Sequence, residues 1–273
     1  MDKNFLKTIL NRLSKMGCHE ADVFFSKSKT SSCSSRLGKI EKKEESSTNE
    51  IGIRAIINKK QSIVSTTNLE KQNVYNLTEK VVEMAKVVPE NQYCGLAESD
   101  KIKQVSKQEV QKLEICDTYE PTMSLIEKEV IKLEESALDN KEITNSEGAE
   151  IAYSKNSICL LGSNGLEIEM EKTHSDFIIA VLAGSKDSME REYDYKSKVF
   201  YNELGDFEKI GKEVSQNAIK KLNSRKLKTC KSDVIFDSKV SSSLLRNLFS
   251  ASNAQSIVKG ISFLKDKMNN KVF

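Results

Sequence analysis

Tryptophan is absent from this chain of 273 residues, and histidine and proline occur only twice each. Aromatic residues reach only 6%, so a core must rely mainly on aliphatic side chains. With 38% hydrophobic and 30% charged residues, the composition is nevertheless typical of a soluble globular protein. The length is sufficient for one or two domains with a real core.

No two of the six cysteines form a Cys-x-x-Cys pair, which excludes a zinc knuckle and a thioredoxin-like redox motif. They are also scattered over a long chain, so the sequence does not indicate a disulfide framework. We expect all six to be reduced thiols that mostly serve packing: Cys18, Cys33, Cys94, Cys116, Cys159 and Cys230.

Long apolar runs are absent as well. The longest, Phe177–Ala183, falls far short of the ~20 residues that a bilayer-spanning helix needs. Near the N-terminus, Lys3, Lys7 and Arg12 interrupt the apolar residues, whereas a secretory signal has a continuous apolar segment. The sequence therefore predicts a cytoplasmic protein with no membrane partner.

Charge of one sign does not accumulate anywhere along the chain. Lysine and arginine number 43 against 40 aspartates and glutamates, which gives a net charge of +3 with the signs mixed. Because nucleic-acid binders concentrate positive charge in a patch or stripe, we expect no nucleic-acid partner.

The two histidines offer only weak catalytic signals. His19-Glu20 opens a zinc-protease motif, but the second ligand is missing because Val23 occupies the position four residues later. His174 and Asp176 have the chemistry of a base and its orienting acid, but a polar strand end explains them better. We interpret both histidines as ordinary surface residues.

Two small-residue segments also lack the context of a catalytic site. Gly162 and Asn164-Gly165 have neither the strand–glycine–helix order nor the Lys-Ser/Thr of a phosphate-binding loop, so we expect a turn. Ser241-Ser242-Ser243 begins a helical pattern, where hydroxyl groups cap backbone amides, and no histidine follows residue 174 to activate a serine.

The first half of the chain predicts an antiparallel meander with helices. Phe5, Ile9, Leu13 and Met16 share one helical face that ends at Gly17. Period-two patterns then predict strands over residues 21–28, 32–37, 40–46, 51–57 and 62–67. Apolar spacings of three and four predict helices over 74–88 and 126–137, which we expect to cover one face of the meander as an α+β layer.

The second half predicts an antiparallel sheet of four or five strands, from residues 151–161, 166–171, 177–182 and 189–195. A hairpin turn at Ser163-Asn164-Gly165 joins the first two of these strands. A helix from Phe207 to Leu222, a short strand over Asp233–Phe236 and a further helix starting near Val240 complete the expected elements.

Several segments together resemble the TldD/PmbA family, and most closely its PmbA branch, also called TldE. They are Gly52-Ile53-Arg54, Ser65-Thr66, Asn145-Ser146-Glu147-Gly148 and Ser262–Lys267. Each motif is weak alone, but their order and intervals fit over nearly the whole chain. The hairpin at Asn58-Lys59-Lys60 departs from the family because it lacks the glycines common at that turn.

The resemblance implies an α+β fold with an N-terminal α/β domain over residues 1–140 and a central antiparallel β region with a helix over 141–225. Residues 226–273 are expected to begin a truncated C-terminal domain, because members of the family continue beyond the segment that matches Phe273. A missing sheet partner would leave apolar surface of this last part exposed.

The resemblance also implies a function: cytoplasmic metalloprotease subunits that pair as a TldD–TldE heterodimer and degrade unfolded peptides. In the TldD subunit, a His-Glu-x-x-x-His helix holds zinc, and its positions correspond here to Arg246, Asn247 and Ala251. None of these can act as a zinc ligand or general base, so we expect no metal and no catalytic residue in this chain, with zinc in the TldD-type partner.

Two functions remain open from the sequence. The first is a non-catalytic, TldE-like subunit that helps to hold peptide by edge-strand pairing, with a contact through the sheet around Ile158–Met170. The alternative is a stand-alone peptide-binding or regulatory remnant without protease activity.

Overall fold

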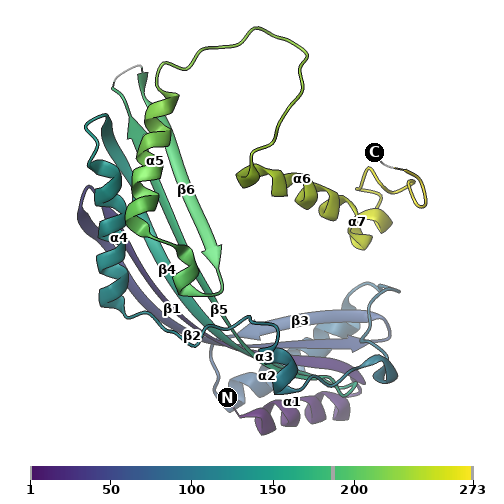
Figure 1. Ribbon diagram of the computed structural model, residues 1–273. Coiled ribbons are helices and arrows are strands. Elements are labelled where there is room, and N and C mark those ends of the chain that lie inside the picture. The colour runs from purple at the N-terminus through teal and green to yellow at the C-terminus, as the bar shows by residue number, and fades with distance from the viewer. Residues whose placement is uncertain (1, 186–187, 272–273) are drawn as a thin grey trace. The chain divides into compact units, whose positions relative to one another are not determined.

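A six-stranded antiparallel sheet forms the centre of the structure, a computed structural model that describes residues 2–185 and 188–271. Its strands lie in the order β3-β2-β1-β4-β5-β6 (Figure 1). Their bounds are β1 Glu20–Arg36, β2 Lys39–Ile57, β3 Lys60–Thr66, β4 Ile143–Gly162, β5 Glu167–Ala183 and β6 Glu190–Lys198. The mixed helix and strand content confirms the predicted α+β class.

The strands are longer and fewer than the sequence predicted. β1, β2, β4 and β5 contain 17, 19, 20 and 17 residues, well above the usual length of about 5–6. The predicted strands 21–28 and 32–37 merge into β1, 40–46 and 51–57 into β2, and 166–171 and 177–182 into β5. Each prediction stopped where the apolar alternation stopped, but backbone pairing on both sides of β1 continues through its polar middle.

Two tight turns join the first three strands. Leu37 and Gly38 between β1 and β2 have φ of 52° and 74°, and Asn58 and Lys59 between β2 and β3 have φ of 48° and 61°. Positive φ at both central residues is the type I′ geometry whose twist suits a hairpin. The second turn therefore forms without the glycines common in the family.

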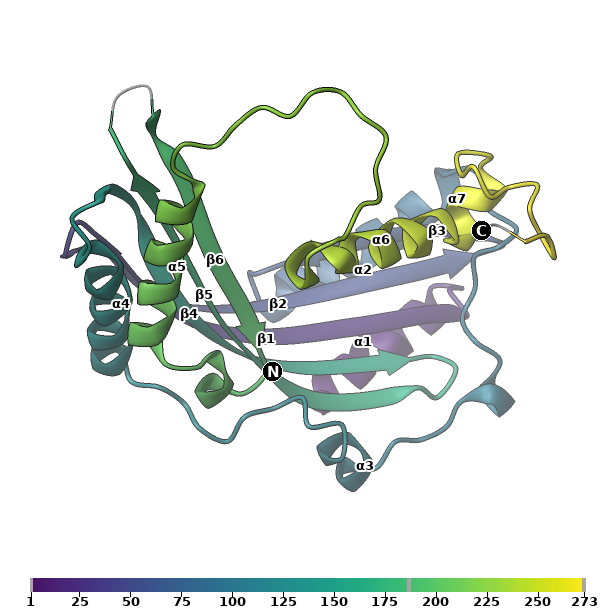
Figure 2. The same ribbon diagram turned by 45° about the horizontal axis from the view of Figure 1, so that its top comes forward.

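The first hydrophobic core lies under α1 (Lys3–Lys15) and α2 (Lys71–Val87), at the end of the sheet formed by β1–β3 and the β4–β5 hairpin. Figure 2 shows both helices beside this part of the sheet. Ile9 and Leu13 of the predicted helical face are fully buried, and so is Leu6, which the prediction did not include; Phe5 and Met16 are only half-buried.

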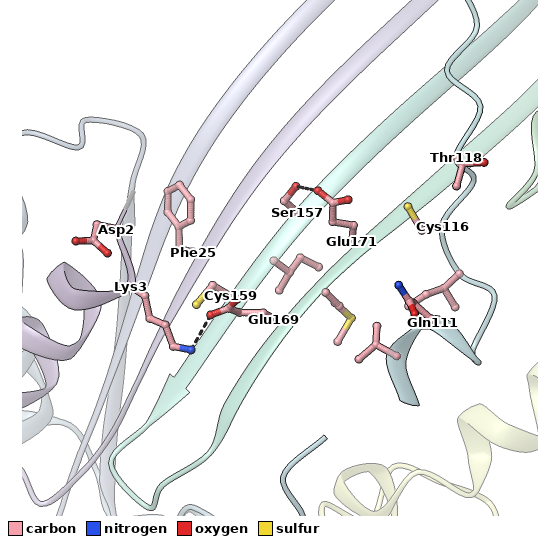
Figure 3. A pocket seen from close by; sticks show the side chains of 14 residues that line it. Asp2, Lys3, Phe25, Gln111, Cys116, Thr118, Ser157, Cys159, Glu169 and Glu171 are labelled. Carbon is pink, nitrogen blue, oxygen red and sulfur yellow. Dashed lines mark hydrogen bonds and ion pairs between the residues drawn. The ribbon is translucent and has the colours of Figure 1, made fainter. Parts of the chain in front are cut away.

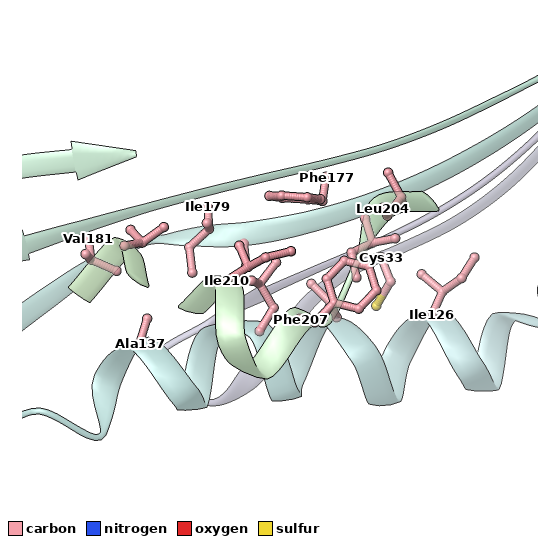
Figure 4. Packing of buried hydrophobic residues seen from close by; sticks show 14 of the residues in the cluster. Cys33, Ile126, Ala137, Phe177, Ile179, Val181, Leu204, Phe207 and Ile210 are labelled. Atoms are coloured by element: carbon pink, nitrogen blue, oxygen red, sulfur yellow. The ribbon is translucent and has the colours of Figure 1, made fainter. Parts of the chain in front are cut away.

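The second core lies under α4 (Met123–Leu138) and α5 (Phe207–Lys221), at the opposite end of the long strands. Its centre is Phe177, whose ring contacts that of Phe207 edge-on at 5.7 Å (Figure 4). The expectation that the helices 74–88 and 126–137 cover one face of the meander is confirmed, although α2 and α4 lie over opposite ends of that face and belong to separate cores.

Both helix pairs cover the same pleated face. The core residues of β1 and β4 carry odd numbers at both ends, for example Val23 and Cys33 in β1. Because side chains alternate along a strand, odd positions share one face.

Between α2 and α4, the chain forms a short 3₁₀ turn (η1, Ser99–Lys101) and the short helix α3 (Lys107–Gln111).

Residues from Arg225 onward form a second compact unit, separate from the first, which ends at Ser224. It contains α6 (Ser238–Ala251) and α7 (Ala254–Val258), so the predicted helix near Val240 is confirmed. The predicted strand Asp233–Phe236 is wrong: the segment is irregular and Ile235 is 97% exposed. A strand needs a neighbour for its backbone groups, and none lies beside this segment in the described residues.

Candidate functional site

A pocket of about 960 Å³ opens in the first unit, beside β5 and between the start of α1 and α3 (Figure 3). Its floor is a set of side chains on the helix-covered face of the sheet. Phe25 of β1 is opposite Cys159 of β4, which is opposite Glu169 of β5, and Ser157 is opposite Glu171 in the next row. The period-two pattern of the strands places all five on one face.

One wall is the N-terminal turn of α1. The Asp2 side chain caps this helix by accepting a hydrogen bond from the Asn4 backbone N–H at 3.1 Å. Lys3 extends toward β5, where its ammonium group lies 2.8 Å from the Glu169 carboxylate. It also pairs with Glu167, so the helix start is held to the strand by ion pairs.

The other wall is the end of α3 and the segment after it. Five of its residues line the pocket: Val110, Gln111, Ile115, Cys116 and Thr118. Thr173 of β5 holds this segment, because its backbone N–H donates to the Ile115 carbonyl at 3.0 Å and its hydroxyl accepts from the Asp117 N–H at 2.7 Å. The buried Asp117 carboxylate accepts the Tyr201 N–H at 2.9 Å, which links the wall to the second core.

The pocket lining is acidic in a chain of positive net charge. Among the described residues of the lining, three carry a carboxylate (Asp2, Glu169 and Glu171) and one carries an ammonium group (Lys3). Glu171 accepts a hydrogen bond from the Ser157 hydroxyl at 3.0 Å and lies 3.5 Å from the ammonium group of Lys155, outside the lining. Such a lining favours a cationic ligand over an anionic one.

Two cysteines line the pocket, but neither is set up as a nucleophile. Burial raises the pKa of the Cys159 thiol, and the neighbouring Glu169 carboxylate raises it further. Burial likewise raises the pKa of the Cys116 thiol. Both thiols are therefore protonated at neutral pH, whereas the thiolate is the reactive form.

In the structure all six cysteines are free, as the sequence predicted. Thiol labelling tests whether the thiols of Cys116 and Cys159 are unreactive. We expect Cys230, which is exposed, to react quickly with an aromatic disulfide reagent at pH 7, and the other five thiols to react quickly only after unfolding in urea. The control is Cys230→Ser, which should remove the fast phase. Fast labelling that persists in this variant would contradict the protected state of the pocket thiols.

The residues that carried weak catalytic signals do not assemble a relay. On the open face of the sheet, the Ser197 hydroxyl lies 3.1 Å and the Asp176 carboxylate 3.4 Å from the same atom, Nε2 of His174. A relay needs the acid on the opposite ring nitrogen from the serine. Burial raises the pKa of Asp176, and the nearby His174 partly offsets this shift. The cluster is a polar surface group at the end of the β5–β6 pairing.

The remaining small motifs have structural roles. His19 is exposed, and Asn164-Gly165 forms the expected turn, with Gly165 at φ 91°. The expected capping role of Ser241-Ser242-Ser243 was wrong. The helix cap is Asp237, whose carboxylate accepts from the Lys239 N–H at 2.8 Å, and Ser241 instead bonds back to the Ser238 carbonyl.

The Asn145-Ser146-Glu147-Gly148 segment forms an irregularity in β4 beside a buried carboxylate. Glu134 of α4 is fully buried and accepts from the Ser146 hydroxyl at 2.6 Å and from the Leu37 N–H at 2.9 Å. Gly148 has φ 110°, and a Cβ there would lie 2.8 Å from the Ser35 carbonyl oxygen. The segment is therefore structural, since it joins β4 to the β1–β2 turn.

Family models match almost the whole chain. The PmbA/TldA metallopeptidase domain 1 matches residues 21–85, the central domain 100–222 and the C-terminal domain 229–273. The chain belongs to the PmbA/TldD family. The family assignment made from the sequence motifs is confirmed, and with it the fit of the PmbA (TldE) branch.

Curated relatives and solved structures agree with this assignment. The metalloprotease PmbA homolog of Buchnera aphidicola from Acyrthosiphon pisum is 26% identical over 99% of this chain and 60% of its own length. Metalloprotease PmbA of Escherichia coli O157:H7 is 24% identical over 92% of this chain and 55% of its own length. The chain thus spans somewhat more than half the length of these two relatives.

Two crystal structures share the fold. A Bacteroides thetaiotaomicron protein described as a modulator of DNA gyrase has a TM-score of 0.84 at 19% identity, over 99% of this chain and 61% of that one. TldE of Thermococcus kodakarensis has a TM-score of 0.64 at 17% identity, over 79% of this chain and 47% of that one. At these identities the likeness concerns the fold.

The positions that the resemblance aligns with the zinc helix of TldD lie on α6 of the second unit. Arg246 and Asn247 are exposed there, and Ala251 ends the helix. A guanidinium group is a permanent cation, an asparagine amide does not take up and return a proton, and alanine has no donor atom. These three side chains therefore do not fit a zinc ion.

Elsewhere in the described residues, no three histidine, cysteine, aspartate or glutamate side chains come together as a metal-binding group. Over the same part of the chain, every helix is too short or too polar to cross a bilayer. The pocket wall formed by α3 and the segment after it was not predicted from the sequence, because residues 91–118 carry no clear periodicity. The only signal was a few apolar residues, such as Val110 and Ile115, in an otherwise polar segment.

Proposed function

We propose that this chain is a non-catalytic, TldE-like subunit of a cytoplasmic, TldD-type zinc metalloprotease complex that degrades unfolded peptides. Membership of the PmbA/TldD family supports the association with proteolysis. The chemistry of α6 supports the assignment, because Arg246, Asn247 and Ala251, at the positions that the resemblance aligns with a zinc helix, have no side chain that could hold zinc or act as its general base. Zinc and the general base would then come from the TldD-type partner.

The test measures cleavage of an unfolded, fluorescence-quenched peptide by the TldD-type subunit of the same organism. Adding this chain is expected to raise the rate by about tenfold or more, equivalent to ~1.4 kcal/mol in the barrier. This chain alone should cleave nothing, and a chelator should abolish the activity of the mixture. An unchanged rate would contradict the proposal.

A stand-alone peptide-binding module is the second candidate, favoured by the pocket, which is built entirely from the first unit. The same assay separates the two functions. Peptide binding by this chain without any effect on the TldD-type subunit would favour the independent module.

A further inference from the structure

The outer edge of β5 changes its neighbour along its length. Residues Ser175–Ala183 pair with β6, which ends where Lys198 is opposite Ser175. At Thr173 the edge instead pairs with the Ile115 carbonyl. From Glu167 to Lys172, no strand of the described residues lies beside this edge, and the pocket opens there.

The direction of the backbone groups on this edge follows from the contacts of β5. The N–H of Thr173 points outward, since it donates to Ile115. Backbone groups alternate in direction along a strand, so those of Glu171 and Glu167 point outward as well. An edge with outward-pointing N–H and C=O groups is the template on which an extended peptide adds as a further strand.

The available length and volume suit a short extended segment. Six residues of β5 span about 20 Å at ~3.3 Å per residue. The volume of about 960 Å³ is at the upper end of the range for ligand pockets. The segment after α3 already takes the position of a neighbouring strand at Thr173, so an added strand would continue this pairing.

The side chains on the two faces define the ligand further. On the helix-covered face, an added strand would lie beside Glu171 and the acidic lining of the pocket. On the open face it would lie beside Met170, which is paired with Ile158 of β4. Alternate ligand residues would therefore meet carboxylates on one face and apolar groups on the other.

The geometry points to a binding site for an extended cationic peptide, with basic and apolar residues in alternation, added antiparallel to β5 at Glu167–Lys172. The inference rests on the proposed function only in taking an unfolded peptide as the ligand. It goes further by locating the contact on this chain, at a strand edge remote in sequence from α6, and by assigning it a charge preference.

The probe is a fluorescein-labelled hexapeptide of three Lys-Val repeats, and its dissociation constant for this chain alone is measured by fluorescence anisotropy. An acidic analogue of three Glu-Val repeats is expected to bind at least about tenfold more weakly. Glu171→Lys should weaken binding of the lysine peptide by about tenfold and strengthen that of the acidic analogue. The matched control, Glu45→Lys, makes the same charge change on an exposed part of β2 outside the pocket and should change binding less than about twofold.

Backbone pairing is tested with two methylated peptides. In an antiparallel pair, the lysine N–H groups would face β5 and the valine N–H groups would face away. N-methylation of the three lysines should therefore reduce affinity by about tenfold or more, and N-methylation of the three valines much less. Equal loss from both peptides, equal affinity for the acidic analogue or no saturable binding would each overturn the inference.

The outcome is independent of the cleavage assay. If the lysine peptide does not bind but the TldD-type subunit is still activated, this site fails and the proposed function stands. If the peptide binds as described but activation is absent, the site stands and the subunit role fails.

Discussion

Glu134→Ala is expected to lower the free energy of unfolding by about 3 kcal/mol, because it removes a buried acceptor that three donors share. The carboxylate accepts from the Ser146 hydroxyl at 2.6 Å and from the N–H groups of Leu37 and Gly38 at 2.9 and 3.2 Å. These contacts connect α4 to both the β1–β2 turn and β4. Alanine would leave the buried Ser146 hydroxyl and the part-buried N–H groups of Leu37 and Gly38 without this acceptor.

Urea titration followed by far-UV circular dichroism measures this effect. The matched control is Glu135→Ala, one residue along the same helix, where the side chain is exposed and the change should stay within about 0.5 kcal/mol. Glu134→Gln should lie between the two, because its amide keeps one acceptor oxygen but places two N–H donors beside other donors. Equal stability of the two alanine variants would show that the buried contacts contribute nothing.

The helices could be predicted from the sequence because each buries one face against a single layer. In α2, Val74 and Val81 are buried as the spacing required, and in α4 so are Ile126 and Val130. What the spacing could not give was which end of the sheet lies beneath each helix. The apolar spacing of a helix shows only which of its faces is buried. The patterns of α2 and α4 were therefore alike, although the two helices cover opposite ends of the strands.

The strands were predicted in pieces for a related physical reason. The polar middle of β1, from Lys27 to Thr30, carries no buried face, so alternation of hydrophobicity is lost there. Its regularity comes from backbone pairing with β2 and β4, for example Ser28 with Thr48 and with Asn156. Such pairing is independent of side-chain type and leaves no pattern in the sequence.

The candidate site was predictable in part. The strand contact around Ile158–Met170 was expected, and both residues line the pocket. The wall formed by Ile115 and Cys116 was not expected, because it depends on hydrogen bonds to Thr173, which is far away in the chain. The end of β6 at Lys198, which leaves the β5 edge open, depends on the relative lengths of two strands and has no local signal.

Gly211→Ala is expected to destabilise the first unit by about 2–3 kcal/mol, although the same change at an exposed helical site stabilises by ~1 kcal/mol. The reversed sign has a geometric cause. Gly211 lies in α5 where this helix meets α4, and a Cβ there would lie closer than 3.0 Å to the Leu133 carbonyl oxygen and 3.1 Å from the Ala137 nitrogen. Because both atoms belong to the backbone of α4, the two helices would have to separate over the second core.

The measurement is the shift in urea midpoint, with Gly52→Ala as the control. Gly52 lies in β2, and a Cβ there would meet only the Phe24 Cβ, at 3.9 Å, which is ordinary contact. We expect the control to change stability by less than about 1 kcal/mol. If Gly211→Ala were instead as stable as the original chain, α4 and α5 would have to pack less closely than their contact at this glycine requires, and the second core would tolerate a wider helix spacing.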